Sequence, residues 1–87
     1  MISIIFHRDF EKKYIKLSQK DKQRIKERIR IFKEDIFNPI LNNHPLEGKY
    51  KGYRSINITG DLRIIYKLQN INVIIFVAIN NHSNLYK

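Results

Sequence analysis

The chain has 87 residues, which is enough for one small domain, residues 1–87, and leaves no room for a second. It carries 17 Lys and Arg against 8 Asp and Glu, a formal net charge of +9. An excess of this size favours polyanionic partners such as nucleic acid, the ribosome or an acidic protein, and a charge that only maintains solubility is the simpler alternative. The chain has no cysteine, so disulfides and cysteine-ligated zinc are excluded.

Targeting and membrane signals are also missing from the sequence. The N-terminus has no lysine-led apolar run followed by small residues, so we expect no signal peptide. No stretch of about 18 apolar residues occurs, so we expect no membrane partner. These features together predict a cytoplasmic protein.

The N-terminal half predicts one strand and two helices. Apolar residues alternate over positions 2–6, which is typical of a β-strand. A short helix should follow, with apolar residues at helical spacing: Phe10, Tyr14 and Leu17. A longer helix should begin at Ser18, which forms a capping-box pattern with Asp21, and should end at Asn38-Pro39. Its apolar stripe consists of Ile25, Ile29, Phe32 and Ile36.

The C-terminal half predicts a loop and three strands. Residues 40–51 are polar and contain both Pro45 and Gly48, so we expect a loop there. The expected strands cover residues 53–58, 62–68 and 73–79, with turns between them. The last strand is apolar on both faces and should be central. The order βααβββ predicts an α+β domain with two helices on one face of an antiparallel-rich, four-stranded sheet.

Polar residues of the C-terminal half supply the groups that metal-free cleavage of RNA requires. Histidine gives and takes a proton near neutral pH, arginine donates to two phosphate oxygens at once, and an aromatic ring stacks on a base. The candidate residues are His44 in the loop, Asp61 in a turn, Arg54 and Arg63 on strands, and His82 and Tyr86 after the last strand. A sheet of this order could bring the loop, the turn and the C-terminus to one edge.

Each candidate also has a simpler structural interpretation. Asp61 follows Gly60 and suits an ordinary hairpin turn, and His44 could be a solvated loop residue. The two arginines could protect a sheet edge, and Tyr86 could pack on the core. For Tyr53 and Tyr66, which fall within expected strands, we expect core packing. His7 is expected to be an incidental surface residue. The histidines lack metal-site spacing, so we expect no metal.

Four segments of the C-terminal half resemble the RelE/StbE superfamily of bacterial toxins, and in particular its YafQ-like branch. The segments are residues 44–48, 51–54, 60–66 and 82–86. The N-terminal half is similar in pattern only, through its aromatic residues and its basic amphipathic helix. The resemblance spans nearly the whole chain and implies a compact RelE-like fold. It also implies an mRNA interferase, an endoribonuclease that enters the ribosomal A site and cuts the translated message.

The resemblance assigns roles to residues of this chain. Catalytic roles fall on His44, Asp61, His82 and Tyr86, with His82 as general acid and His44 and Asp61 as the base and its orienting partner. Arg63 lies where RelE-like toxins have a phosphate-binding arginine, and Arg54 where they often have a lysine or arginine, so both would bind the scissile phosphate. From their charge, we also expect Lys49 and Lys51, with the basic second helix, to contact ribosomal RNA. No metal or cofactor is implied. The implied partners are a cognate antitoxin, the ribosome and mRNA, with operator DNA contacted only through the antitoxin complex.

The sequence also departs from the YafQ-like pattern. Asn57 stands where YafQ has a second histidine, and Leu62 stands where it has a tryptophan. Ala78 replaces an arginine, and Asn80 replaces a glycine. Two alternatives remain open. One is a non-catalytic inhibitor of DNA gyrase, like the ParE proteins of the same superfamily, although these generally lack the histidine and aspartate set found here at His44, Asp61 and His82. The other, which Asn57 and Ala78 favour, is an inactive relic that still binds its antitoxin.

Overall fold

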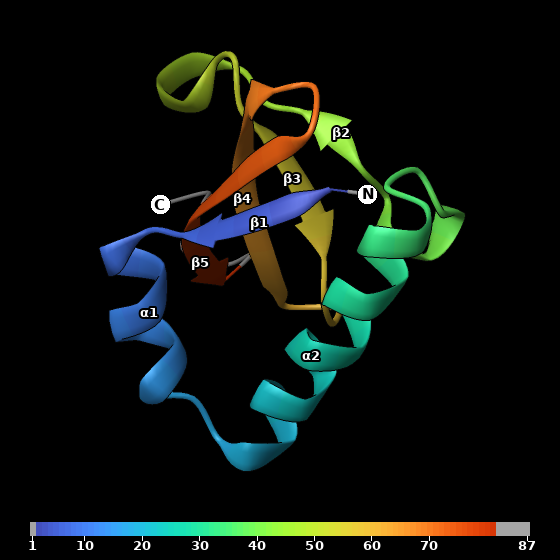
Figure 1. Cartoon of the computed structure of the whole chain (residues 1–87). Coiled ribbons are helices and arrows are strands. Elements are labelled where there is room, and N and C mark those ends of the chain that lie inside the picture. The colour runs from blue at the N-terminus through green and yellow to red at the C-terminus, as the bar shows by residue number, and fades with distance from the viewer. Residues whose placement is uncertain (1, 82–87) are drawn as a thin grey trace.

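The computed structural model of the chain describes residues 2–81 (Figure 1). His82 and Tyr86, which the sequence predicted to be catalytic, therefore lie outside the described residues. The main elements in chain order are β1 (Ser3–Phe6), α1 (Arg8–Ile15), α2 (Gln19–Glu34), β2 (His44–Pro45), β3 (Arg54–Asn57), β4 (Leu62–Asn70) and β5 (Val73–Asn81). Two short 3-10 helices, Pro39–Leu41 and Gly48–Tyr50, flank β2.

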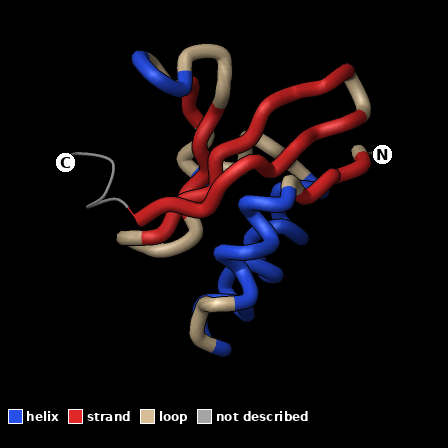
Figure 2. Tube along the Cα trace, turned by 90° about the vertical axis from the view of Figure 1, so that its left-hand side faces the viewer, coloured by secondary structure: helices blue, strands red, loops and turns tan. Residues whose placement is uncertain are grey.

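The strands form one mixed sheet in the order β1-β5-β4-β3-β2. β1 pairs with β5 in parallel, and the other pairs are antiparallel. Both helices lie on one side of this sheet (Figure 2). The α+β prediction and the placement of the helices are confirmed.

The predicted number of four strands was wrong, because the sheet has five. The additional strand, β2, lies in the region 40–51 that the sequence predicted to be a loop. It contains only His44 and Pro45, which is too short for any alternation of apolar residues to be visible. Pro45 cannot donate a backbone hydrogen bond, and it is tolerated because β2 is the edge of the sheet.

The start of α2 agrees with the sequence, but its end does not. Ser18 is the N-cap, and its side chain accepts a hydrogen bond from the Asp21 backbone N–H at 3.1 Å. The helix ends at Glu34, before the predicted Asn38-Pro39. Asp35 is extended (φ −156°), and its carboxylate accepts from the Phe37 N–H at 3.1 Å. A side chain that bonds nearby backbone groups in this way competes with helix propagation.

The core lies between the helices and one face of the sheet. Its centre is Phe32 of α2, which is fully buried and packs edge-on against Tyr66 and Phe76, with ring centroids 5.1 and 5.5 Å away. The hydroxyl of Tyr66 accepts a hydrogen bond from the Asn43 side chain at 2.7 Å. Core packing of Tyr66 is thus confirmed. It was wrong for Tyr53, which is only half-buried and lines a hollow outside the core cluster.

The other sheet face points away from α1 and α2, and we call it the distal face. Its residues follow from strand alternation and pairing: Ser55, Asn57, Arg63, Ile65, Lys67, Ile75, Ala78 and Asn80, with His44 at the edge. Within residues 2–81, no helix is both long enough and apolar enough to cross a membrane.

Candidate active site on the distal face

Strand register brings His44 and Arg63 to the same face of the sheet. His44 pairs with Ser55, which pairs with Ile65, so these residues form one row across the distal face. Asn57 pairs with Arg63, and together they form the next row. Residues directly opposite each other point to the same face, and rows two residues apart are separated by about 7 Å. A proton carrier and a cation therefore lie in neighbouring rows.

A single hydrogen bond fixes the protonation pattern of the neutral His44 ring. Its Nδ1 lies 2.7 Å from the carbonyl oxygen of Asn42. A carbonyl can only accept, so Nδ1 carries the hydrogen and Nε2 keeps a lone pair. Asn42 adopts the left-handed conformation (φ 46°, ψ 49°) at the end of the Pro39–Leu41 turn, which asparagine tolerates well. The local backbone thus holds the imidazole in the form that can accept a proton.

The two predicted phosphate-binding arginines lie on opposite faces. Arg54 pairs with Tyr66, whose ring is in the core, so Arg54 emerges on the helix side. Its Nε donates to Asn43 Oδ1 at 2.7 Å, and its guanidinium carbon lies 5.4 Å from the Phe37 ring centroid. Neither arginine forms an ion pair with a described carboxylate, but Arg63, unlike Arg54, also makes no side-chain hydrogen bond to a described residue. The geometry therefore favours Arg63 over Arg54 as a ligand for the phosphate that His44 would address.

Asn43 is a structural residue that the sequence analysis did not single out. Its side chain donates to the Ile36 carbonyl and the Tyr66 hydroxyl, at 2.8 and 2.7 Å, and accepts from Arg54. It thereby links the end of α2 to β3 and β4. Its only signal in the sequence was its position directly before His44, and nothing local indicated partners on distant strands.

Asp61 is an exposed residue of the turn between β3 and β4. The turn is closed by Thr59, whose hydroxyl accepts from the backbone N–H groups of Asp61 and Leu62, at 3.2 and 3.0 Å. Leu62 also pairs with Asn81, the last residue of β5. The end of β5 is therefore beside the turn that carries Asp61. Among residues 2–81, no three His, Asp or Glu side chains gather as a metal site.

A hollow of about 410 Å³, which we call the distal hollow, adjoins the His44 row. Its lining residues are His7, Asp9, Lys49, Tyr50, Tyr53, Lys67, Ile75, Val77 and Ala78. Lys49, one of the predicted RNA-contacting residues, reaches over Tyr50 with its Nζ 5.6 Å from the ring centroid. Lys51 is exposed and follows the Gly48–Tyr50 turn directly. His7 is more than a surface residue, because its Nδ1 caps α1 by accepting from the Asp9 N–H at 3.1 Å.

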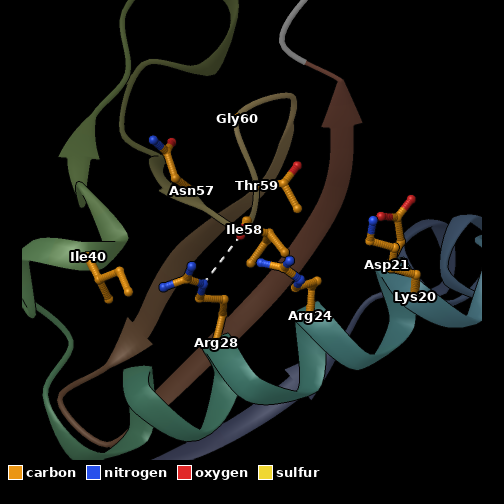
Figure 3. Close-up of a pocket in the computed structure, with 9 residues that line it drawn as sticks. All are labelled: Lys20, Asp21, Arg24, Arg28, Ile40, Asn57, Ile58, Thr59 and Gly60. Atoms are coloured by element: carbon orange, nitrogen blue, oxygen red, sulfur yellow. Dashed lines mark hydrogen bonds between the residues drawn. The ribbon is translucent and has the colours of Figure 1, made fainter.

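A second basic hollow, of about 600 Å³, lies between α2 and the β3–β4 hairpin (Figure 3). Arg24 and Arg28 extend into it from α2, and Arg28 Nε donates to the Ile58 carbonyl at 3.3 Å. The Asn57 side chain points away from these two arginines (Figure 3). This hollow contains none of the residues predicted to carry acid–base chemistry, so we place the candidate active site on the distal face.

Comparisons with known proteins show the family and the fold of the chain. Residues 2–87 match the family of bacterial toxins of type II toxin–antitoxin systems, YafQ. The chain is 25% identical to YafQ from E. coli strain BL21(DE3), with all of both chains covered and a TM-score of 0.77. It is 26% identical to a chain of the E. coli DinJ–YafQ complex, again with full coverage and a TM-score of 0.75.

The fold extends to more distant toxins. A chain of the YoeB–YefM complex from Staphylococcus aureus is 20% identical, with 94% of this chain and 98% of that chain covered, and its TM-score is 0.74. At this identity the likeness shows the fold alone. No curated protein sequence matches the chain.

Proposed function

We propose that this chain, which belongs to the YafQ family and is a toxin of a type II toxin–antitoxin system, is an endoribonuclease that cuts mRNA on the ribosome. One observation carries the proposal. His44 keeps a lone pair at Nε2 that no described residue occupies, and it shares the distal face with Arg63, an arginine that no described carboxylate neutralises. A base and a cation on one face of a sheet are suited to a phosphodiester with a neighbouring hydroxyl.

The proposed reaction needs no metal. Nε2 of His44 removes the proton from a 2′-hydroxyl, and the 2′-oxygen attacks the adjacent phosphorus. The bond from phosphorus to the 5′-oxygen breaks, and His82 gives that oxygen a proton. The products are a 2′,3′-cyclic phosphate and a 5′-hydroxyl. Arg63 stabilises the extra negative charge on the phosphoryl oxygens.

Two further roles belong to the same proposal. His82 follows Asn81 directly in the sequence, and β5 ends at Asn81 beside the turn of Asp61, so we assign Asp61 to orienting a catalytic histidine. Tyr86 is assigned to stacking on a base at the cut. Both His82 and Tyr86 lie outside the described residues, so these assignments rest on the family pattern.

The proposed partners follow from charge and from the relatives. Lys49, Lys51 and the basic face of α2 would contact ribosomal RNA, and we place the protein in the cytoplasm with the ribosome. Because E. coli YafQ occurs in a complex with DinJ, we expect a cognate antitoxin to bind this chain. Operator DNA would be contacted only through that complex.

The test is to incubate the purified protein with mRNA, with and without translating ribosomes, and to map the new 5′ ends. We expect cuts within codons that require ribosomes, and a loss of about 100-fold or more in rate for His44→Ala and for His82→Ala. Full activity of both variants would refute the catalytic roles. Growth arrest without cuts would favour a gyrase inhibitor, to be checked by a supercoiling assay. Antitoxin binding without arrest would indicate an inactive relic.

A further inference from the structure

We propose that the distal hollow binds the base of the nucleotide next to the scissile phosphate, with Tyr50 and Tyr53 as its stacking residues. This inference rests on the proposed function, since it extends the same RNA strand beyond His44. None of the residue roles assigned above includes Tyr50, Tyr53 or Lys67.

The first support is continuity with the candidate active site. Ala78 pairs with Ile65 in the row of His44, and it also lines the hollow. Lys67 lies two residues beyond Ile65 on the same strand, so it occupies the next row of the distal face. Tyr53 lies two residues before Ser55, which is the β3 partner of Ile65. If the scissile phosphate of an RNA lies between His44 and Arg63, the next nucleotide needs to extend only about 7 Å, the spacing of one row, to reach the hollow.

The second support is the chemistry of the lining. The rings of Tyr50 and Tyr53 both line the hollow and meet edge to face at 76°, with centroids 5.9 Å apart. Lys49 Nζ lies 5.6 Å from the Tyr50 centroid, and Lys67 Nζ lies 5.9 Å from the Tyr53 centroid. Sites for single-stranded nucleic acid combine aromatic rings, which stack on bases, with cations that follow the backbone. Here each tyrosine has its own lysine.

The third support is the sign of the charge. Among the described lining residues, Asp9 alone carries a carboxylate, and this group lies 3.8 Å from His7 at the start of α1. Lys49 and Lys67 are not paired with any described carboxylate. The surroundings of the two tyrosines are therefore cationic, which favours a polyanion.

Two other hollows in the described part of the chain lack this combination. The basic hollow between α2 and the β3–β4 hairpin has no aromatic residue among its described lining residues. A hollow of about 330 Å³ between the helices contains Phe6, Phe10 and Tyr14, but it also contains Glu11 and lies on the helix side. It offers a matched control, because Tyr14 is also half-buried with a lysine over its ring, Lys22 at 5.8 Å.

The experiment measures binding of a fluorescent RNA oligonucleotide whose riboses are 2′-O-methylated, so that no 2′-hydroxyl is available for cleavage. We expect Tyr50→Leu and Tyr53→Leu each to weaken binding about tenfold, the effect of one lost stacking partner. Tyr50→Phe keeps the ring and should bind like wild type, as should Tyr14→Leu. Equal losses in Tyr50→Leu and Tyr50→Phe, or a similar loss in Tyr14→Leu, would overturn the inference.

The lysines give an independent measurement that does not depend on how the tyrosine variants fold. The slope of log affinity against log salt should fall by about 0.7 in Lys67→Gln, as expected for one lost phosphate contact to a single strand. Lys16→Gln, at the exposed C-cap of α1, should leave the slope unchanged. An unchanged slope in Lys67→Gln would count against the site.

The two proposals fail separately. If the protein makes ribosome-dependent cuts that need His44, while Tyr50→Leu changes neither oligonucleotide binding nor the position of the cuts, the hollow is not the base site. A second outcome is that no RNA is cut with or without ribosomes, while Tyr50→Leu weakens oligonucleotide binding and Tyr50→Phe does not. This outcome would support the base site and refute the nuclease proposal.

Discussion

The two faces of the sheet carry different chemistry although the same strands build both. The helix-covered face is aromatic and aliphatic, with Phe32, Tyr66 and Phe76 at its centre. The distal face carries His44, Arg63 and Lys67 on the alternate residues. A shift of one residue in register would exchange the two sets, because successive side chains of a strand point in opposite directions. Stability and the proposed chemistry are therefore separable by mutation.

The largest effect is expected from the helix-covered face. Phe32→Ala removes a fully buried ring and should lower the free energy of unfolding by about 3–5 kcal/mol. In a domain this small, such a loss is a large part of the total. Urea denaturation followed by circular dichroism measures it. Phe37→Ala, at a ring that is 60% exposed, is the control and should cost about 1 kcal/mol or less. Similar losses in both variants would contradict the assignment of the core.

The two arginines give the next comparison. Arg63→Gln should slow RNA cleavage about 100-fold, because it removes the cation beside the phosphate, and it should leave stability nearly unchanged. Arg54→Gln should lower the free energy of unfolding by about 1–2 kcal/mol, because Asn43 loses its charged partner. Its cleavage rate per folded molecule should match wild type. Single-turnover cleavage and urea denaturation on both variants separate these effects, and a reversed pattern would refute the assignment of the two faces.

Asn57→His sharpens the comparison by adding a proton carrier to the distal face. Asn57 shares a row with Arg63, and its buried Oδ1 has no hydrogen-bond partner within residues 2–81. The new imidazole would stand where YafQ has a histidine, so we expect cleavage to become about tenfold faster. The same substitution at Asn72, exposed in the β4–β5 turn, should have no effect on the rate. A rate for Asn57→His at or below wild type would count against the shared site.

The smallest effect is expected at the N-cap of α2. Ser18→Ala removes the hydrogen bond to the Asp21 N–H and should cost about 1 kcal/mol of stability. Cleavage by the folded protein should not change, because the cap is remote from the distal face. Ser3, exposed in β1, forms no side-chain hydrogen bond with described residues, so Ser3→Ala is the matched control. Equal stability of the two variants would show that the cap contributes little.

The sequence by itself determined the features that depend on neighbours a few residues apart. Helical spacing of apolar residues located both helices, and Ser18 with Asp21 marked the start of α2. Apolar segments bounded by turn residues located the long strands and hence the α+β class. The motifs of the C-terminal half were sufficient to indicate the YafQ family, since they are continuous segments of chain.

Only the tertiary structure decided which face each polar residue occupies. β2 is too short for a pattern, and it exists because His44 and Pro45 pair with a strand about ten residues later. The position of Arg54 depends on Asn43, which in turn bonds Tyr66, 23 residues further along the chain. The sequence predicted that Tyr53 packs in the core, and this was wrong. The face that a strand residue occupies is set by the pairing of its strand and not by its residue type. Pairing between distant segments leaves no local pattern, and so the distal face could not be recognised before the strands were aligned.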